Sequence, residues 1–264
     1  MIALPFSRHA EKSKEDTNTK EKNKTNFVHL ADGTRHSIGI TSEGYAISWG
    51  RSNALGQLGR QTTTSSSSAK LPGRVQLPVK ASKAFTSEGC TADSGHSAIL
   101  DENGMLWMAG CDRWQQLGLG SSKGGSSGYT WKDGKLWQET FIESIHVIDL
   151  MKEQDPSSTI RDVALGGDHT LILSSNQRDV YAFGKGGDGQ LGLVGKPFVS
   201  APIKSKTLSE SGVAALCAIK ACSMTLDDGG RVKSKAGKCR SNVVEEGLAK
   251  CRARAQRNGL IQMS

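Results

Sequence analysis

The sequence predicts an all-β protein built from repeated units of three or four short antiparallel strands. Three observations support this class: a high glycine content, a scarcity of proline and aromatic residues, and a residue pattern that recurs along the chain. Glycine accounts for 31 of the 264 residues, whereas there are 6 prolines and only 5% aromatic residues. Many short strands joined by tight turns fit this composition better than long helices do.

The recurring unit begins with a histidine and ends with a Gln-Leu-Gly motif. In the first unit, His36 is followed by a glycine turn, a Trp-Gly pair and then Gln57-Leu58-Gly59. The same order recurs from His96 and from His169, and a decayed fourth copy starts at Cys222 without a Gln-Leu-Gly motif. These starts lie 60, 73 and 53 residues apart, which is the size of a unit with three or four strands.

Within a unit, the residues alternate with a period of two. The segments Ser37–Ile40 and Tyr45–Trp49 are therefore expected to form two strands, with Ser42–Gly44 as the hairpin turn between them. The histidines are spaced for separate units, so we expect each to make one structural hydrogen bond rather than to join a metal or acid-base site. The glutamines of the Gln-Leu-Gly motifs are expected to tie turns to main-chain groups.

Taken together, the His-Ser, Trp-Gly and Gly-Gln-Leu-Gly elements resemble the repeat of the regulator of chromosome condensation family. The resemblance covers roughly Val28 to Gly237 and implies the blades of a β-propeller. Proteins of this family close a ring of seven blades, for which three clear copies and one decayed copy are too few. The expected fold is a partial or short β-propeller: either the chain is a fragment or a diverged gene product, or it forms an open arc that a partner or a second copy completes. An open arc leaves an edge strand unpaired, which favours strand augmentation or aggregation.

We expect three regions along the chain. Residues 1–26 are mostly polar and charged and are predicted to be disordered. Residues 27–237 form the repeat array, with units starting near residues 36, 96, 169 and 222. An insertion at residues 118–160 contains a stretch that predicts a hairpin or an elongated outer strand pair. Residues 238–264 are a basic tail, in which good helix formers with a weak apolar stripe favour a helix.

The positive charge is concentrated near the C-terminus. The formal net charge is +8, and residues 231–264 hold nine basic and two acidic side chains, or +7, which leaves about +1 for the rest of the chain. This segment could bind nucleic-acid phosphates, act as a nuclear localisation signal, or be a solvated tail. The nucleic-acid-binding candidates are Lys233, Lys235, Lys238, Arg240, Lys250, Arg252, Arg254 and Arg257.

The variable turn before each Gln-Leu-Gly motif is the better candidate for binding a protein partner, because loop tips on a rigid scaffold diverge at little cost to the core. The candidate residues are Asn53, Asp112, Arg113, Trp114 and Asp188. In family members that act as exchange factors, polar and acidic loop residues contact a small GTPase, and the resemblance implies this role for Asp112 and Asp188. Arg113 and Trp114 are residue types that anchor interfaces. The alternative is that all five are solvated turn residues.

No nucleophile-base set, pair of carboxylates in a common motif or phosphate-binding loop is found in the sequence. We therefore expect a non-enzymatic interaction scaffold without cofactor or metal, whose most concrete version is a guanine-nucleotide exchange factor. The alternatives are a chromatin or nucleic-acid adaptor that binds through the basic tail, and a truncated, non-functional repeat fragment.

The cysteines, the apolar runs and the first residues indicate in which cellular compartment the protein is expected. The six cysteines contain no Cys-x-x-Cys pair and no histidine at zinc-finger spacing, so we expect reduced thiols. The longest apolar run, Val213–Ile219, is too short to span a membrane. The first residues lack the features of a secretory signal, and a cytoplasmic or nuclear location is expected.

Overall fold

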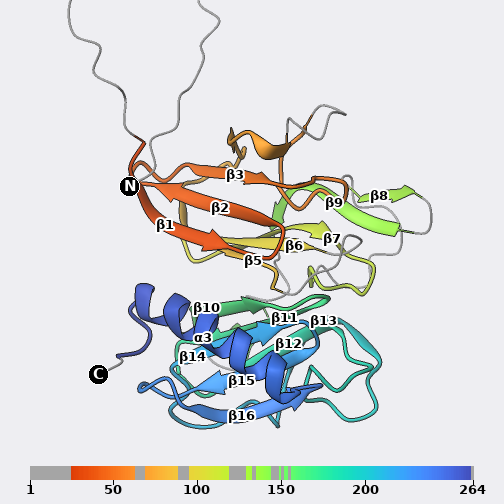
Figure 1. The fold of residues 1–264 in the computed structure, drawn as a ribbon, viewed down its shortest axis with the longest axis vertical. Coiled ribbons are helices and arrows are strands. Elements are labelled where there is room, and N and C mark those ends of the chain that lie inside the picture. Colours follow the sequence, from red (N-terminus) through yellow and green to blue (C-terminus); the bar gives the residue numbers. More distant parts are fainter. Residues whose placement is uncertain are drawn as a thin grey trace, which may run out of the picture.

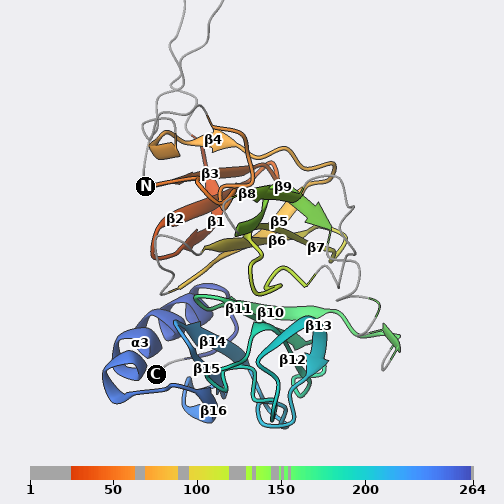
Figure 2. The same ribbon diagram turned by 90° about the vertical axis from the view of Figure 1, so that its right-hand side faces the viewer.

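The computed structural model describes residues 25–62, 69–88, 95–118, 129–132, 135–143, 149, 152–153 and 156–262. Its strands form four separate antiparallel sheets that follow one another in chain order (Figures 1 and 2). The all-β class predicted from the repeats is confirmed. Disorder is predicted for residues 1–26, and residues 1–24 of this segment lie outside the described part of the chain.

The sheets contain three to five strands each. The first consists of β1 (Phe27–Asp32), β2 (His36–Thr41), β3 (Ala46–Gly50) and β4 (Gly73–Arg74). The second consists of β5 (Ala81–Thr86), β6 (His96–Asp101), β7 (Leu106–Cys111), β9 (Lys135–Glu143) and β8 (Tyr129–Lys132). The third consists of β10 (Ile160–Leu165), β11 (His169–Ser174), β12 (Val180–Lys185) and β13 (Phe198–Lys204). The fourth consists of β14 (Ala215–Ile219), β15 (Cys222–Leu226) and β16 (Val232–Gly237), and the helix α3 (Ser241–Arg257) follows it.

Each sequence repeat starts at the second strand of a sheet. His36, His96, His169 and Cys222 are the first residues of β2, β6, β11 and β15. The first strands β1, β5, β10 and β14 contact one another in succession and so form the inner side of an open arc. In the insertion, β8 pairs with β9 and β9 pairs with β7, which extends the second sheet by two strands.

A repeated hydrogen-bond relay joins neighbouring sheets. The Nε2 atoms of His36, His96 and His169 lie 2.6, 2.9 and 2.8 Å from the hydroxyl oxygens of Ser97, Thr170 and Ser223 on the next sheet. Each hydroxyl donates to the main-chain carbonyl of the Gln-Leu-Gly glutamine in the histidine's own unit. Because the hydroxyl hydrogen is used on that carbonyl, the imidazole must carry its proton on Nε2 and donate it. The expected structural hydrogen bond of each histidine is present.

The three relay histidines are neutral. Burial lowers the pKa of His36 to about 4 and the pKa values of His96 and His169 to about 3. The Nδ1 atom of each ring is buried and has no hydrogen-bond partner in the described residues. Protonation would place a buried hydrogen on Nδ1 without a hydrogen-bond acceptor, and this cost further favours the neutral ring.

The helix α3 covers one face of the fourth sheet. In the first three units, the corresponding face is covered by the next sheet in chain order. Along β14, Leu216 and Ala218 join the core that is shared with the third sheet. Cys217 and Ile219, which alternate with them, join a second core with α3. The helix approaches closely at Gly247, where an added Cβ would lie 2.7 Å from the Ile219 side chain. The helix expected in the tail is thus an integral cap on the last sheet.

The prediction of reduced thiols is wrong for four of the six cysteines. Cys217 of β14 is bonded to Cys251 of α3, and Cys222 of β15 is bonded to Cys239. Cys111 is buried, and Cys90 lies outside the described residues. The bonded cysteines are 34 and 17 residues apart, so no short motif marks them. They meet only because the chain after β16 folds back over the fourth sheet.

Candidate partner-binding face

The variable loops lie at the ends of the third strands and are held by their own side chains. Asn53 and Asp112 occupy the same place, four residues before the motif glutamine, and their Oδ1 atoms accept hydrogen bonds of 2.8 Å from the main-chain N–H groups of Leu58 and Leu117. Asp112 is only 4% exposed. These two candidates therefore shape their loops from inside.

The motif glutamines tie the same turns to the main chain, as predicted. The side-chain oxygens of Gln57, Gln116 and Gln190 accept hydrogen bonds from the main-chain N–H groups two residues before them. The loop tips are thus presented on a rigid base, which suits a recognition surface.

The tips of the second, third and fourth units meet in one place. Arg113 is exposed beside the half-buried Trp114, and its guanidinium lies 5.8 Å from the Trp114 ring centroid. The Lys185 ammonium, from the third unit, lies 5.4 Å from the same centroid. Asp188 lies 3.7 Å from Lys185 and 2.5 Å from Lys238 of the fourth unit. We name these five residues the loop-tip cluster.

Electrostatics within this cluster are mixed, with an excess of positive charge. The hydrogen bond from Lys238 is the main reason that the pKa of Asp188 lies below its usual value. Burial raises the pKa of Asp168, which directly precedes β11, and the positive charges of Arg113 and Lys185 oppose this rise. Sequence reasoning did not place Lys185 and Asp168 among the candidates, although Lys185 is the last residue of the third strand, directly before the variable loop.

The structure brings together Arg113, Trp114 and Asp188 but gives no contact between them and Asn53. An aromatic ring flanked by cations and one solvated carboxylate can bind a protein surface through apolar and charged contacts. Among the described residues, no group of three or more histidine, cysteine or acidic side chains could hold a metal ion.

The basic candidates near the C-terminus are spread over β16, the following loop and α3. Five of the eight have partners within the fold: Lys233 with Glu210, Lys238 with Asp188, Lys250 with Glu88, Arg252 with the Gly230 carbonyl, and Arg254 with Asp162. Lys235 and Arg240, together with Arg257 at the end of α3, are exposed. Most of these basic side chains, which the sequence places in an apparent tail, therefore make contacts within the fold.

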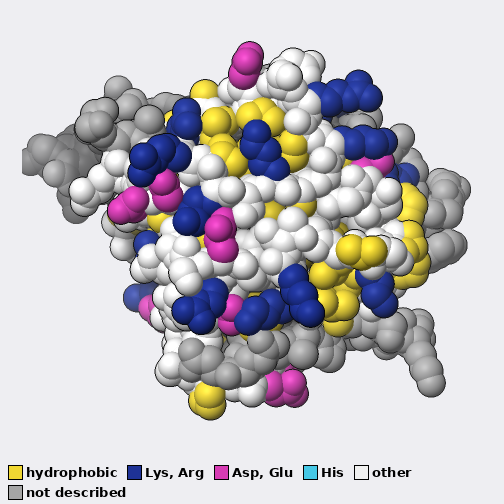
Figure 3. All heavy atoms as spheres, turned by 90° about the horizontal axis from the view of Figure 1, so that it is seen from below, with side chains coloured by type: hydrophobic (Ala, Val, Ile, Leu, Met, Phe, Trp, Pro, Cys, Tyr) yellow, Lys and Arg dark blue, Asp and Glu magenta, His cyan; other side chains and the backbone are white. Residues whose placement is uncertain are grey.

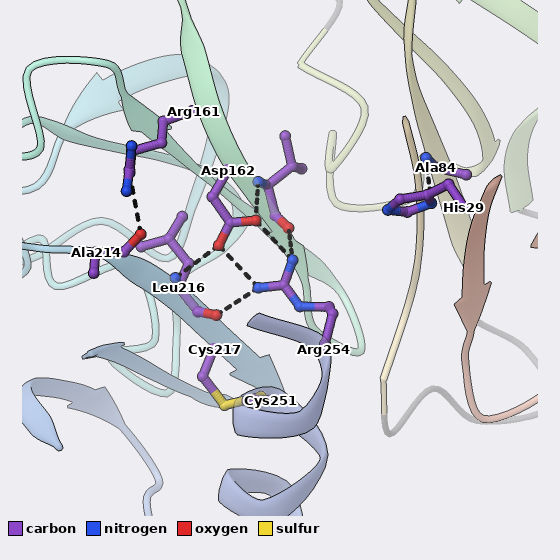
Figure 4. A network of polar contacts seen from close by, with 10 residues as sticks. His29, Ala84, Arg161, Asp162, Ala214, Leu216, Cys217, Cys251 and Arg254 are labelled. Carbon is purple, nitrogen blue, oxygen red and sulfur yellow. Dashed lines mark hydrogen bonds and ion pairs between the residues drawn. A yellow bond between two sulfur atoms is a disulfide. The ribbon is translucent and has the colours of Figure 1, made fainter. Parts of the chain in front are cut away.

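Arg254 makes the strongest of these connections. Its guanidinium donates to both carboxylate oxygens of Asp162 on β10, at 2.7 and 2.9 Å, and to the carbonyls of Val163 and Leu216 (Figure 4). Asp162 is 1% exposed and also accepts a hydrogen bond from the Leu216 N–H. One side chain of α3 thus joins the inner strands of the third and fourth sheets.

A cavity of about 290 Å³ lies where the inner strands face α3. Its lining includes His29 of β1 and Lys250 of α3. The His29 Nδ1 atom accepts a hydrogen bond of 3.3 Å from the Ala84 N–H, and burial is the main reason that its pKa falls to about 4. Lys250 forms an ion pair with Glu88. The side chains of His29 and Lys250 therefore both make contacts within the fold. No helix in the described part of the chain is long and apolar enough to cross a membrane.

Comparison with known proteins matches the repeat and the fold. A family model described as the regulator of chromosome condensation (RCC1) repeat matches residues 160–190, which run from β10 to the third Gln-Leu-Gly turn. The Xenopus laevis protein named Protein RCC2 homolog is 31% identical over 173 residues, which cover 63% of this chain and 31% of that protein. This chain therefore spans about a third of the length of such relatives.

Solved propeller structures superpose on the four sheets. Prp20p from Saccharomyces cerevisiae has 18% identity and a TM-score of 0.56, over 85% of this chain and 47% of that one. Human WBSCR16 also has 18% identity and a TM-score of 0.56, over 82% of this chain and 48% of that one. At this identity the likeness shows the fold alone. The third unit of the chain thus matches the regulator of chromosome condensation (RCC1) repeat, and the four sheets are folded as an open part of a β-propeller.

Proposed function

We propose that the chain is a non-enzymatic scaffold that binds a protein partner through the loop-tip cluster, and that this partner is a small GTPase whose nucleotide exchange it promotes. The observation that supports the proposal is the meeting of Arg113, Trp114, Lys185, Asp188 and Lys238 from three units on one rigid face. The small GTPase follows from the family resemblance. Prp20p, which shares the fold, is described with its binding to Gsp1p and histones.

Exchange requires differential binding and no covalent step. The face must hold the nucleotide-free GTPase more tightly than the loaded form, because a ligand shifts an equilibrium only by its difference in affinity for the two states. Asp188 is the acidic group at the tips that a partner can reach, since Asp112 is buried within its own turn. We therefore assign the acidic contact to Asp188 and the apolar anchor to Trp114.

Nucleotide release from a panel of small GTPases loaded with fluorescent GDP tests the proposal. The wild-type chain should accelerate release from one of them, and Trp114→Ala should weaken binding of its nucleotide-free form by about thirtyfold, the effect of a typical anchor residue. Arg178→Ala, at an exposed turn in the third unit, is the matched control and should leave binding unchanged. No acceleration with any GTPase, or equal effects of the two variants, would contradict the proposal.

The nucleic-acid adaptor stays an alternative prediction, and the structure changes how it must be tested. Deleting residues 231–264 would remove β16 and α3 and so disrupt the last sheet. The triple variant Lys235→Glu, Arg240→Glu and Arg257→Glu changes exposed charge instead. If duplex DNA binds the wild-type chain with a steep salt dependence, and this variant removes that dependence, the nucleic-acid adaptor is favoured over the GTPase partner. A cytoplasmic or nuclear location accompanies both proposals.

A further inference from the structure

The outer edge of the fourth sheet is open in the part of the chain that the structure describes. In the other three sheets a further strand, β4, β9 or β13, pairs with the third strand of the unit. The fourth sheet ends at β16, because the chain then turns into α3. Figures 1 and 2 show β16 at the margin of the molecule, with its outer side away from the other sheets.

The β16 edge differs in length and composition from the outer strands of the first and third sheets. β4 has only two residues. β13 contains Pro202, which has no N–H to donate. β16 has six residues and no proline, and its pairing with β15 is irregular between Met224 and Leu226. Its outward main-chain groups can therefore template an added strand.

Two lysines determine which strand can be added. Lys233 and Lys235 are exposed and lie two residues apart on β16, where the pairing with β15 is irregular. Lys235 has no ion-pair partner among the described residues, and Lys233 lies 4.0 Å from Glu210. Figure 3, which views the molecule from the side where β16 lies, shows Lys and Arg side chains spread over this surface with fewer acidic ones.

A second copy of this chain is a poor occupant of the edge. Antiparallel pairing of two β16 strands would set Lys233 of each copy near Lys235 of the other, and like charges across a strand pair destabilise it. A strand with acidic residues at alternate positions turns both repulsions into attractions. We propose that the β16 edge binds an extended polypeptide segment with acidic residues at alternate positions, which becomes the fourth strand of the last sheet.

Two short peptides test the proposal on the full-length protein. One alternates valine and glutamate, and the other carries lysine in place of glutamate. NMR titration to about 1 mM, which detects weak binding, should show binding of the glutamate peptide and protection of the β16 amides from hydrogen exchange. The lysine peptide should bind about tenfold more weakly or not at all, given two cross-strand charge pairs. N-methylation of the peptide amides that face β16 should abolish binding.

Charge reversal separates strand addition from general attraction to a basic protein. Lys233→Glu with Lys235→Glu should reverse the preference, so that the lysine peptide binds better, and Lys235→Glu alone should lower the preference without placing a new acid beside Glu210. The matched double variant Arg178→Glu with Lys196→Glu changes the same charge at exposed sites of the third unit and should keep the preference. The proposal is overturned if the glutamate peptide does not bind, if β16 gains no protection, or if the matched variant acts like the β16 variant.

Discussion

Lowering the pH from 7.5 to 5.5 should destabilise the protein through the histidines that join its sheets. His36, His96 and His169 are neutral when folded because burial lowers their pKa to about 4, 3 and 3. In the unfolded chain, each titrates near its ordinary pKa of about 6.5. Between pH 6.5 and 4 the unfolded chain therefore binds more protons than the folded one, so stability falls as the pH falls.

The magnitude follows from the ordinary pKa, because the folded rings remain unprotonated over this range. Each histidine should lower the free energy of unfolding by about 1.4 kcal/mol between pH 7.5 and 5.5, and the three together by about 4 kcal/mol. His29, whose pKa is also lowered to about 4, acts in the same direction. A loss of this size is a large part of the stability of a typical domain, which is roughly 5–15 kcal/mol.

Urea unfolding followed by tryptophan fluorescence at a series of pH values measures this slope. The variant His96→Gln keeps a side-chain donor for Thr170 but does not titrate in this range, so its loss of stability should be about a third smaller than the relay total. The pH limits stay above the ordinary pKa values of carboxyl groups. A free energy of unfolding that is constant between pH 7.5 and 5.5, or an unchanged slope in His96→Gln, would refute the relay as described.

Three other predictions concern single positions. Gln115→Gly should stabilise the protein by about 1 kcal/mol in thermal unfolding, because Gln115 has a φ of 62° where the first and third units have Gly56 and Gly189 at 71° and 83°; a lower melting temperature would contradict this. Arg254→Ala should cost roughly 3–5 kcal/mol in urea unfolding, since it leaves the buried carboxylate of Asp162 without its cation, and a loss below 1 kcal/mol would refute that role. Cys251→Ser should cost about 4 kcal/mol, because the lost bond closes a segment of 34 residues. Because Cys217 is buried, alkylation is done on the urea-unfolded chain without reductant; mass spectrometry should find Cys217 protected in the wild type and modified in the variant, and equal labelling in both would contradict the disulfide.

The repeat made the fold predictable, because the motif residues perform the same task in each unit. His96, Thr170 and Gln116 form one relay that recurs from sheet to sheet, and the spacing of the motifs located each unit in the sequence. The decayed fourth unit also fits: Cys222 stands where the others have histidine, and its sulfur is bonded to Cys239.

The capping of the last sheet could not be predicted in the same way. Val243–Arg257 shows only a weak apolar stripe, since it packs on one sheet through a few residues and uses Arg254 and Cys251 for its remaining contacts. These contacts depend on partners far away in the sequence. No repeated motif marks these partners, so the sequence alone does not reveal them. For the same reason the meeting of Trp114, Lys185 and Asp188 at one face became visible only in three dimensions.

Light scattering coupled to size-exclusion chromatography, with circular dichroism of the same peak, tests the central claim that four sheets and their helical cap form a stable unit. The full chain should elute as a compact particle with the mass of one chain and a β spectrum. A chain that ends at Gly237 exposes the apolar face which α3 covers, and it should associate. An aggregated or unordered full-length chain would contradict the account, as would a shortened chain that stays monomeric and equally stable.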